Sequence, residues 1–236
     1  MSSNEITALT HSLDLLKDTY NYNHWIYSLL HPYLGAKILE VGAGTGNILQ
    51  FMLRRKEIVC LESSSEFASS LQHTAEMHKN VRVVNGSIED MFSLGISEAC
   101  FDNVLCLNVL EHIDKDIAAV QNMLSALSPE GRLLLFVPAC QWAYGQLDKE
   151  FGHYRRYSKS GLKNTILSAG GFVEKCHYVN FIGVFGWWYS GRIKKDAKID
   201  PVNARIVDRL APFISALERI IAPPVGQSLF AVVRKR

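Results

Sequence analysis

Short apolar runs alternate with amphipathic segments through much of the chain. Five runs have the length and composition of buried strands: 37–41, 57–61, 81–84, 101–107 and 132–137. The segments between them repeat apolar residues every three or four positions, as helices do. Strands that alternate with helices predict an α/β fold with a parallel, doubly wound sheet.

The clearest helix is expected just before the fifth run. One of its faces is apolar, and is formed by Ile117, Val120, Leu124 and Leu127. Asp114 or Asp116 is predicted to cap the start of this helix. The Ser-Pro-Glu-Gly segment at 128–131 is predicted to end it, because proline and glycine break helices.

Both ends of the chain depart from this alternation. Residues 5–30 carry a helical pattern that is broken near residues 21–23, which predicts two helices ahead of the sheet. In the C-terminal third, 171–179 and 227–233 are strand-like, and a helix is expected around 200–221. The sheet should therefore contain seven strands.

The length of the chain favours a single domain. A chain of 236 residues with 48% hydrophobic composition can bury one full α/β core, so we expect one domain over 1–236. Its expected parts are N-terminal helices in 1–34, a ligand-binding core in 35–138, and two insertions, 139–165 and 180–222. The insertions should lie above the carboxyl ends of the strands and form a lid.

Charge and cysteine content limit the expected partners and the expected cellular compartment. The 25 basic and 23 acidic residues nearly cancel, so nucleic acid is not an expected partner. The five cysteines are odd in number and form no C-x-x-C pair, which predicts reduced thiols in a cytoplasmic protein. The first residues lack the features of a secretion signal, and no stretch is long and apolar enough to span a membrane.

A glycine-rich turn follows the first strand. Residues 38–47 read I-L-E-V-G-A-G-T-G-N, which places Gly42, Gly44 and Gly46 at alternate positions with Ala43 between the first two. The dinucleotide pattern G-x-G-x-x-G would need glycine at 47, which is Asn. Glu40 would also repel a pyrophosphate, whereas it would attract a ligand with an ammonium and a sulfonium. S-adenosylmethionine (SAM) is such a ligand.

The E-x-G-x-G-x-G pattern at 40–46 resembles motif I of the class I SAM-dependent methyltransferases, and the resemblance is strongest over 35–140. It implies a Rossmann-like sheet whose last two strands pair antiparallel at one edge. It also implies SAM as cofactor and in-line transfer of its methyl group. Two alternatives remain open: an NAD(P)-dependent oxidoreductase, and a methyltransferase-like binding subunit without turnover.

Several further residues are expected to hold the cofactor. Glu62 ends the second strand twenty residues after Gly42, where this kind of fold places a carboxylate on ribose hydroxyls, and Ser63 follows it. Ser87 stands where the resembling family often has an Asp for the adenine amino group. The Ser87 hydroxyl with the Ile88 amide, or Glu89, would replace that Asp.

The methionine end of SAM would meet two other segments. Asn108 begins Asn-Val-Leu-Glu-His, which is similar to a Leu-Glu-His run in small-molecule members of the family. By that resemblance, the Asn108 carbonyl would face the SAM ammonium. Tyr22 and Trp25 are candidates to cover the methionyl end, although aromatic residues at helical spacing also pack in cores.

The loop at 138–157 is expected to choose the substrate. Its candidate substrate-binding residues are Tyr144, Asp148, His153, Tyr154, Arg155 and Arg156. The loop resembles that of a subgroup of bacterial and archaeal class I methyltransferases linked to cell-envelope or secondary-metabolite pathways. The alternative is that Arg155 and Arg156 pair with Asp148 and Glu150 to hold the lid together.

If the acceptor is a hydroxyl, His153 or His112 is the expected general base, because imidazole titrates near neutral pH. Tyr144 is a further candidate. A metal is not expected. The Mg²⁺-dependent subclass needs clustered acidic residues at the crevice, and Asp102 and Asn103 lie at the wrong end of their strand.

An aromatic segment at 181–189, which includes Trp187, precedes four basic residues: Arg192, Lys194, Lys195 and Lys198. Aromatic residues beside positive charge are typical of membrane-surface elements. The segment is predicted to be a lid over the acceptor, a dimer contact, or a peripheral membrane contact over 181–198. The expected partner is a small-molecule or lipid-linked acceptor, and the protein a monomer or homodimer.

Overall fold

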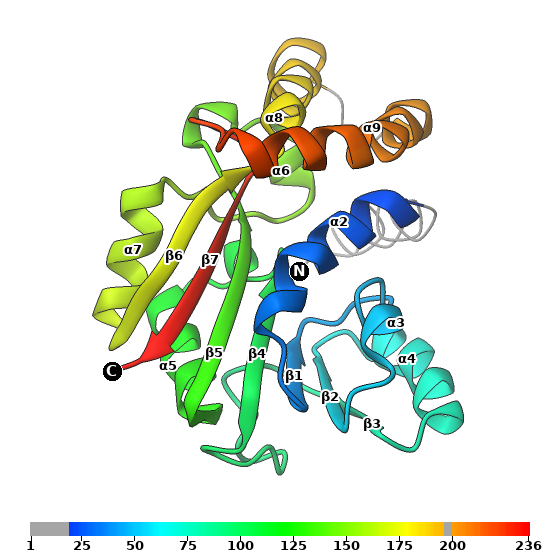
Figure 1. Ribbon diagram of the computed structural model, residues 1–236, viewed down its shortest axis with the longest axis vertical. Helices are drawn as coiled ribbons and strands as arrows, with labels where there is room; N and C mark the ends of the chain where they lie inside the picture. The colour runs from blue at the N-terminus through cyan, green and yellow to red at the C-terminus, as the bar shows by residue number, and fades with distance from the viewer. Residues whose placement is uncertain (1–18, 196–199) are drawn as a thin grey trace.

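The computed structural model describes residues 19–195 and 200–236. Its strands are β1 (Lys37–Val41), β2 (Glu57–Glu62), β3 (Val81–Asn85), β4 (Phe101–Leu107), β5 (Leu127–Pro138), β6 (Gly171–Val179) and β7 (Ser228–Lys235). They form one sheet in the order β3-β2-β1-β4-β5-β7-β6 (Figure 1). The first five strands pair in parallel, and β7 runs antiparallel to both β5 and β6.

The predicted seven-stranded, mostly parallel sheet is confirmed, and so is the antiparallel pairing of its last two strands. The antiparallel strand β7 lies one position inside the sheet, and β6 forms the edge.

The helices are α2 (Tyr20–Leu30), α3 (Leu49–Met52), α4 (Ser65–Met77), α5 (Asp116–Ala126), α6 (Gln146–Glu150), α7 (Lys159–Ser168), α8 (Phe181–Trp188) and α9 (Pro201–Ile220). Strand residues alternate between two buried clusters because successive side chains point to opposite faces. Leu39 and Val104 face α5 and α7, whereas Ile38 and Leu105 face α2, α3 and α9. Both faces of the sheet are therefore covered, as its apolar strands require.

The segment at 128–131 does not end a helix, so that prediction was wrong. The helix α5 ends at Ala126, and β5 begins at Leu127, which pairs with Phe101 of β4. Gly131 lies inside the strand, where an added Cβ would come within 2.8 Å of the Phe101 carbonyl oxygen. Close approach to β4, rather than helix termination, explains this glycine.

The predicted cap of α5 was also wrong. The N-cap position is Lys115, which makes no side-chain cap, and Asp116 lies in the first turn. The Asp116 carboxylate instead accepts a hydrogen bond from the Tyr157 hydroxyl at 2.9 Å and pairs with Arg155 at 3.0 Å. Asp116 therefore binds residues distant in sequence instead of capping its own helix.

The first of the two predicted N-terminal helices lies outside the described residues, as does Lys198. The second corresponds to α2, but α2 already begins at Tyr20, so the break predicted near 21–23 lies inside this helix. The helices α2 and α9 lie side by side (Figure 1). Asp208 of α9 accepts hydrogen bonds from the Tyr22 backbone N–H at 2.9 Å and from Asn21 Nδ2 at 3.0 Å. An acidic side chain of α9 thus caps the N-terminus of α2.

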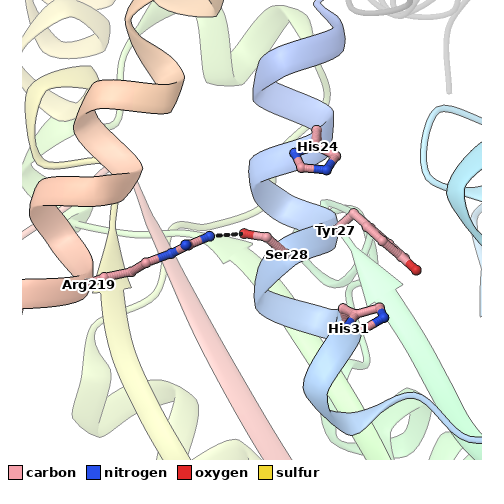
Figure 2. Close-up of a pocket in the computed structure, with 5 residues that line it drawn as sticks. All are labelled: His24, Tyr27, Ser28, His31 and Arg219. Atoms are coloured by element: carbon pink, nitrogen blue, oxygen red, sulfur yellow. Dashed lines mark hydrogen bonds between the residues drawn. The ribbon is translucent and has the colours of Figure 1, made fainter.

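The far end of the same helix pair holds a small cavity of about 360 Å³. Figure 2 shows Arg219 of α9 reaching across it to donate a hydrogen bond to Ser28 Oγ at 3.4 Å. The cavity is lined by His24, Tyr27, Ser28, His31 and Arg219. Polar contacts at both ends therefore join α9 to α2.

Candidate functional site

A cavity of about 670 Å³ lies at the carboxyl ends of β1, β2, β4 and β5, below α8 and α9. An open α/β sheet builds its ligand crevice in this position. The predicted site residues that line it are Tyr22, Glu40, Gly42, Ala43, Gly44, Glu62, Ser63, Asn108, His112, His153, Arg156 and Trp187. The cavity thus joins the glycine-rich turn to the substrate loop.

The glycine-rich turn has the backbone that its sequence requires. Gly42 has a φ of +70°, and an added Cβ would collide with the Val109 side chain. Gly44 also has a positive φ, and its N–H donates a hydrogen bond to Glu62 Oε2 at 2.8 Å. Glycine supplies this conformation without the steric cost of a Cβ, so the backbone can approach a ligand closely.

Glu62 is buried, and both of its carboxylate oxygens already accept hydrogen bonds. The donors are the backbone N–H groups of Gly44 and Ser64, each at 2.8 Å. Each carboxylate oxygen can accept more than one hydrogen bond, so Glu62 can still accept from ribose hydroxyls. The role of Glu62 as a ribose ligand stays a prediction. Its hydrogen bond to the glycine-rich turn was not predicted from the sequence.

Glu40 is buried at 4% exposure, and its Oε2 has no hydrogen-bond partner within the described part of the chain. Burial, together with the nearby negative charge of Glu62, raises the pKa of Glu40 to about 8. An isolated carboxylate is costly to bury. A cationic group bound in the cavity would therefore favour the charged form of Glu40.

A second cluster lies on the other side of the cavity. One ligand-type atom each from Glu111, His112 and His153 lies within 4.8 Å of the other two. The two imidazole rings are nearly perpendicular, with centroids 4.8 Å apart. Burial, helped by His153, lowers the pKa of His112 to about 3, so its ring is neutral at pH 7.

Asp148 holds this side of the cavity together. It is fully buried, and accepts hydrogen bonds from His153 Nδ1 at 2.9 Å, Arg156 Nε at 2.6 Å and Trp187 Nε1 at 3.0 Å. Burial acts to raise the pKa of Asp148, but the His153 hydrogen bond and the Arg156 charge outweigh it, so the pKa is lowered. Arg156 is therefore engaged inside the lid, and its guanidinium also lies 4.8 Å from the Trp187 ring centroid.

Residues 39–133 match the family model described as a methyltransferase domain. This segment of the chain is therefore similar to methyltransferase domains. Ubiquinone biosynthesis O-methyltransferase from Haemophilus ducreyi is 27% identical over 116 residues, which cover 48% of this chain and 49% of that relative. The chain thus spans about half the length of this curated relative.

Solved structures confirm the Rossmann-like fold of the chain. The YcgJ protein from Bacillus subtilis matches with a TM-score of 0.61 and 16% identity, over 90% of this chain and 99% of that one. A SAM-dependent methyltransferase from Archaeoglobus fulgidus matches with a TM-score of 0.57 and 16% identity, over 91% and 94%. At these identities the likeness establishes a Rossmann-like fold alone.

Some predicted site residues do not line the cavity. They are Trp25, Gly46, Ser87, Ile88, Tyr144, Asp148, Tyr154 and Arg155. Trp25 and Ile88 are buried in the core, and the Ser87 hydroxyl donates to Asp90. The Tyr144 hydroxyl donates a hydrogen bond to the His153 carbonyl at 2.8 Å, so Tyr144 holds the backbone of His153 in place.

Arg155 and Tyr154 lie on the surface side of the loop. Arg155 pairs with Asp116 at 3.0 Å and reaches Asp114 at 3.5 Å, while Tyr154 is 60% exposed. The alternative in which both arginines serve as structural pairs thus matches the geometry. The acidic partner of Arg155 comes from α5, however, and not from Glu150.

Glu111 and Asn180 are among the cavity residues that the sequence analysis missed. Glu111 belongs to the quoted Leu-Glu-His run but received no role. Asn180 is 1% exposed with a φ of +63°, caps α8 by accepting from the Gly183 N–H, and donates to Gln227. The signal for Asn180 was an asparagine directly before an apolar helix.

Within the described residues, no helix is both long enough and apolar enough to cross a membrane. All five cysteines are free thiols. Asp102 and Asn103 lie at the amino end of their strand, where they accept hydrogen bonds from the backbone N–H groups of 35–37. They are therefore remote from the carboxyl-end cavity.

Proposed function

We propose that the protein is a SAM-dependent methyltransferase that methylates a hydroxyl group of a small-molecule or lipid-linked acceptor. The observation that carries this proposal is the single cavity that joins the unpartnered Glu40 carboxyl to the His112 and His153 pair. One end suits a cationic donor, and the other suits an acceptor that loses a proton.

The donor end fits SAM by its chemistry. Glu40 would favour a ligand that carries positive charge, and Glu62 would accept hydrogen bonds from the ribose hydroxyls. The Asn108 residue, held at a φ of +53° after β4, lines the cavity beside them, and its carbonyl would face the SAM ammonium. SAM supplies an electrophilic methyl group when bound there.

At the acceptor end, His153 is the best-placed base. Its Nδ1 is engaged by Asp148, which leaves Nε2 free to take a proton. The acceptor oxygen forms a bond to the methyl carbon, the carbon–sulfur bond breaks, and S-adenosylhomocysteine leaves with the electron pair. Holding the two reactants in line can supply ~7–11 kcal/mol of the rate enhancement.

The choice of oxygen as the methylated atom rests on two supports. The imidazoles at the acceptor end would assist loss of a hydroxyl proton. The H. ducreyi relative is named an O-methyltransferase, and its matched segment covers 48% of this chain. Both support a hydroxyl acceptor for this chain.

We further propose that the lid contacts a lipid surface, which would give access to lipid-linked acceptors. Exposed apolar side chains of 181–198 include Phe181, Ile182, Phe185, Trp188, Tyr189 and Ile193. Arg192, Lys194 and Lys195 follow in the same segment. Such a combination binds anionic headgroups while its apolar side chains enter the interface.

Calorimetry with SAM, S-adenosylhomocysteine and NADH tests the donor. We expect saturable binding of the first two and none of NADH; saturable NADH binding in their place would support the oxidoreductase alternative and overturn the proposal. Glu40→Gln should weaken SAM binding at least tenfold, or about 1.4 kcal/mol. Glu57→Gln, which alters a carboxylate with 43% side-chain exposure on β2, is the matched control.

Turnover is tested by transfer of labelled methyl from SAM to hydroxylated aromatic and lipid-linked acceptors. Product whose formation falls in His153→Asn would support the proposed acceptor end. SAM binding with no methylated product from any acceptor would instead favour the non-catalytic binding subunit.

A further inference from the structure

The side chains of Glu111, His112 and His153 converge on one point of the cavity wall. Their ligand-type atoms lie within 4.8 Å of one another, although the residues come from two segments about forty positions apart. We propose that these three residues hold a divalent transition-metal ion, of the zinc or iron(II) type, at the acceptor end of the cavity.

Both imidazoles are already oriented as metal ligands usually are. His153 Nδ1 is hydrogen-bonded to Asp148 at 2.9 Å, and His112 makes a hydrogen bond with the Gly152 backbone. A metal-binding histidine normally donates its other ring N–H to a carboxylate or a backbone carbonyl. Each ring therefore keeps one nitrogen for an ion.

Glu111 supplies a second and independent observation. The residue is 1% exposed, lines the cavity, and its Oε2 has no hydrogen-bond partner among residues 19–195 and 200–236. Leaving a buried carboxylate oxygen unpaired is costly. The nearby His153 and Arg156 charges favour the ionised carboxylate but leave Oε2 without a hydrogen bond, and a cation at this point would remove that cost.

The donor set selects the kind of ion. Two imidazoles and one carboxylate suit zinc or iron(II), while magnesium and calcium prefer sites made of oxygen ligands. Ligands bound at about 2.1 Å lie about 3.4 Å from one another in a tetrahedral site, so modest side-chain rotations would close this cluster. The expectation of no metal considered only carboxylate clusters of the magnesium type.

The ion's role rests on the proposed function. A three-ligand site keeps a coordination position open, and all three ligands line the cavity, so the acceptor hydroxyl can occupy that position. The ion would lower the pKa of the hydroxyl. The proton passes to solvent, the oxygen lone pair forms the bond to methyl, and the carbon–sulfur pair leaves with S-adenosylhomocysteine. With the ion bound, His153 acts as its ligand rather than as the base.

The test measures metal binding without turnover. The full chain, freed of purification tags and stripped with a chelator, is titrated with Co²⁺ followed by visible absorption, and with Zn²⁺ followed by competition. We expect one equivalent of Co²⁺ with the absorption of a low-coordinate nitrogen–oxygen site. Glu111→Gln and His153→Asn should each weaken binding at least tenfold, while His31→Asn, which alters an exposed histidine outside this cavity, should not.

Far-UV circular dichroism of every variant checks the fold, and the conservative Glu111→Gln keeps the test decisive if a histidine variant misfolds. Absence of Co²⁺ binding, or equal binding by wild type and both variants, would overturn the inference. S-adenosylhomocysteine affinity is measured on the same samples. A protein that binds Co²⁺ but not S-adenosylhomocysteine counts against the proposed function alone. A protein that binds S-adenosylhomocysteine but not Co²⁺ counts against the metal site alone.

Discussion

Two buried carboxyl groups at the cavity, Glu40 and Glu111, each leave one oxygen without a partner in the described chain. Burial raises the pKa of Glu40 to about 8 and that of Glu111 to about 7. A fold optimised only for stability would place apolar residues at such positions. Their presence indicates that these residues are arranged for a ligand.

The first prediction concerns Glu40 in the ligand-free protein. Because its pKa rises from 4.5 to about 8 on folding, the folded state holds a proton that the unfolded state releases between these values. The stabilisation present below pH 4.5 is therefore lost as the pH rises to 8. Glu40→Gln avoids this loss, and should raise the free energy of unfolding at pH 8 by about 2 kcal/mol or more.

Urea unfolding at pH 5, 6, 7 and 8 provides the measurement. The gap between Glu40→Gln and wild type should widen with pH, while Glu57→Gln should follow wild type throughout. A constant gap at all four pH values would mean that Glu40 is charged in the ligand-free protein. The same substitution weakens SAM binding in the proposal above, so stability and function would move in opposite directions.

At the scale of elements, the lid is held by polar contacts as well as by apolar packing. Asp148 receives the side chains of His153, Arg156 and Trp187, which belong to the substrate loop and to α8. This one carboxylate therefore joins the two inserted segments. The contribution of these contacts to stability can be measured by removing the charge of Asp148.

Asp148→Asn should destabilise the protein by about 3–5 kcal/mol, because it leaves the buried Arg156 guanidinium without its counter-ion. Thermal and urea unfolding at pH 7 measure the effect. The control is Asp114→Asn, which weakens a pair whose acidic side chain is 71% exposed and should cost under about 1 kcal/mol. Equal effects of the two variants would show that Asp148 is not the main tie of the lid.

The junction between α2 and α9 gives a third prediction. Asp208→Ala removes the acceptor for the Tyr22 N–H, so it should cost about 1 kcal/mol, as loss of an N-cap does. Amide hydrogen exchange should rise in the first turn of α2 and remain unchanged in α4, whose cap is its own Ser64. Unchanged exchange at α2 would contradict this role of Asp208.

Features set by interactions between neighbouring residues could be predicted from the sequence, whereas features set by contacts between distant residues could not. The strand runs and the glycine turn were predicted because periodicity and backbone conformation are local properties. The end of α5 was not, since pairing of Leu127 with β4 overrode the helix-breaking pattern at 128–131. The partners of Asp148 could not be predicted either, because Trp187 lies 39 residues further along the chain.

At the scale of the whole molecule, α8 and α9 lie above the carboxyl ends of the strands (Figure 1), and both helices expose apolar side chains. Along α9 its members are Val202, Ile206, Leu210, Phe213, Leu217 and Ile220, all exposed and spaced three or four residues apart. The acidic side chains of α9 are turned inward, where Asp208 binds α2 and Glu218 binds the start of α8. Arg205 and Arg209 remain exposed beside the apolar stripe.

This arrangement favours an anionic lipid surface over a second protein copy, because the exposed charges of the stripe are basic while its acids are engaged internally. The double variant Phe213→Ser/Leu217→Ser should lose most sedimentation with anionic liposomes while its unfolding free energy changes little, since both side chains are more than half exposed. Met77→Ser, at an exposed apolar site on α4, is the control. Arg205→Glu/Arg209→Glu should weaken binding mainly at low salt, because salt screens the charge contribution. If wild type does not sediment at low salt, the lipid contact is wrong. If the serine variant sediments equally while losing a dimer seen by ultracentrifugation, the surface is a contact between copies.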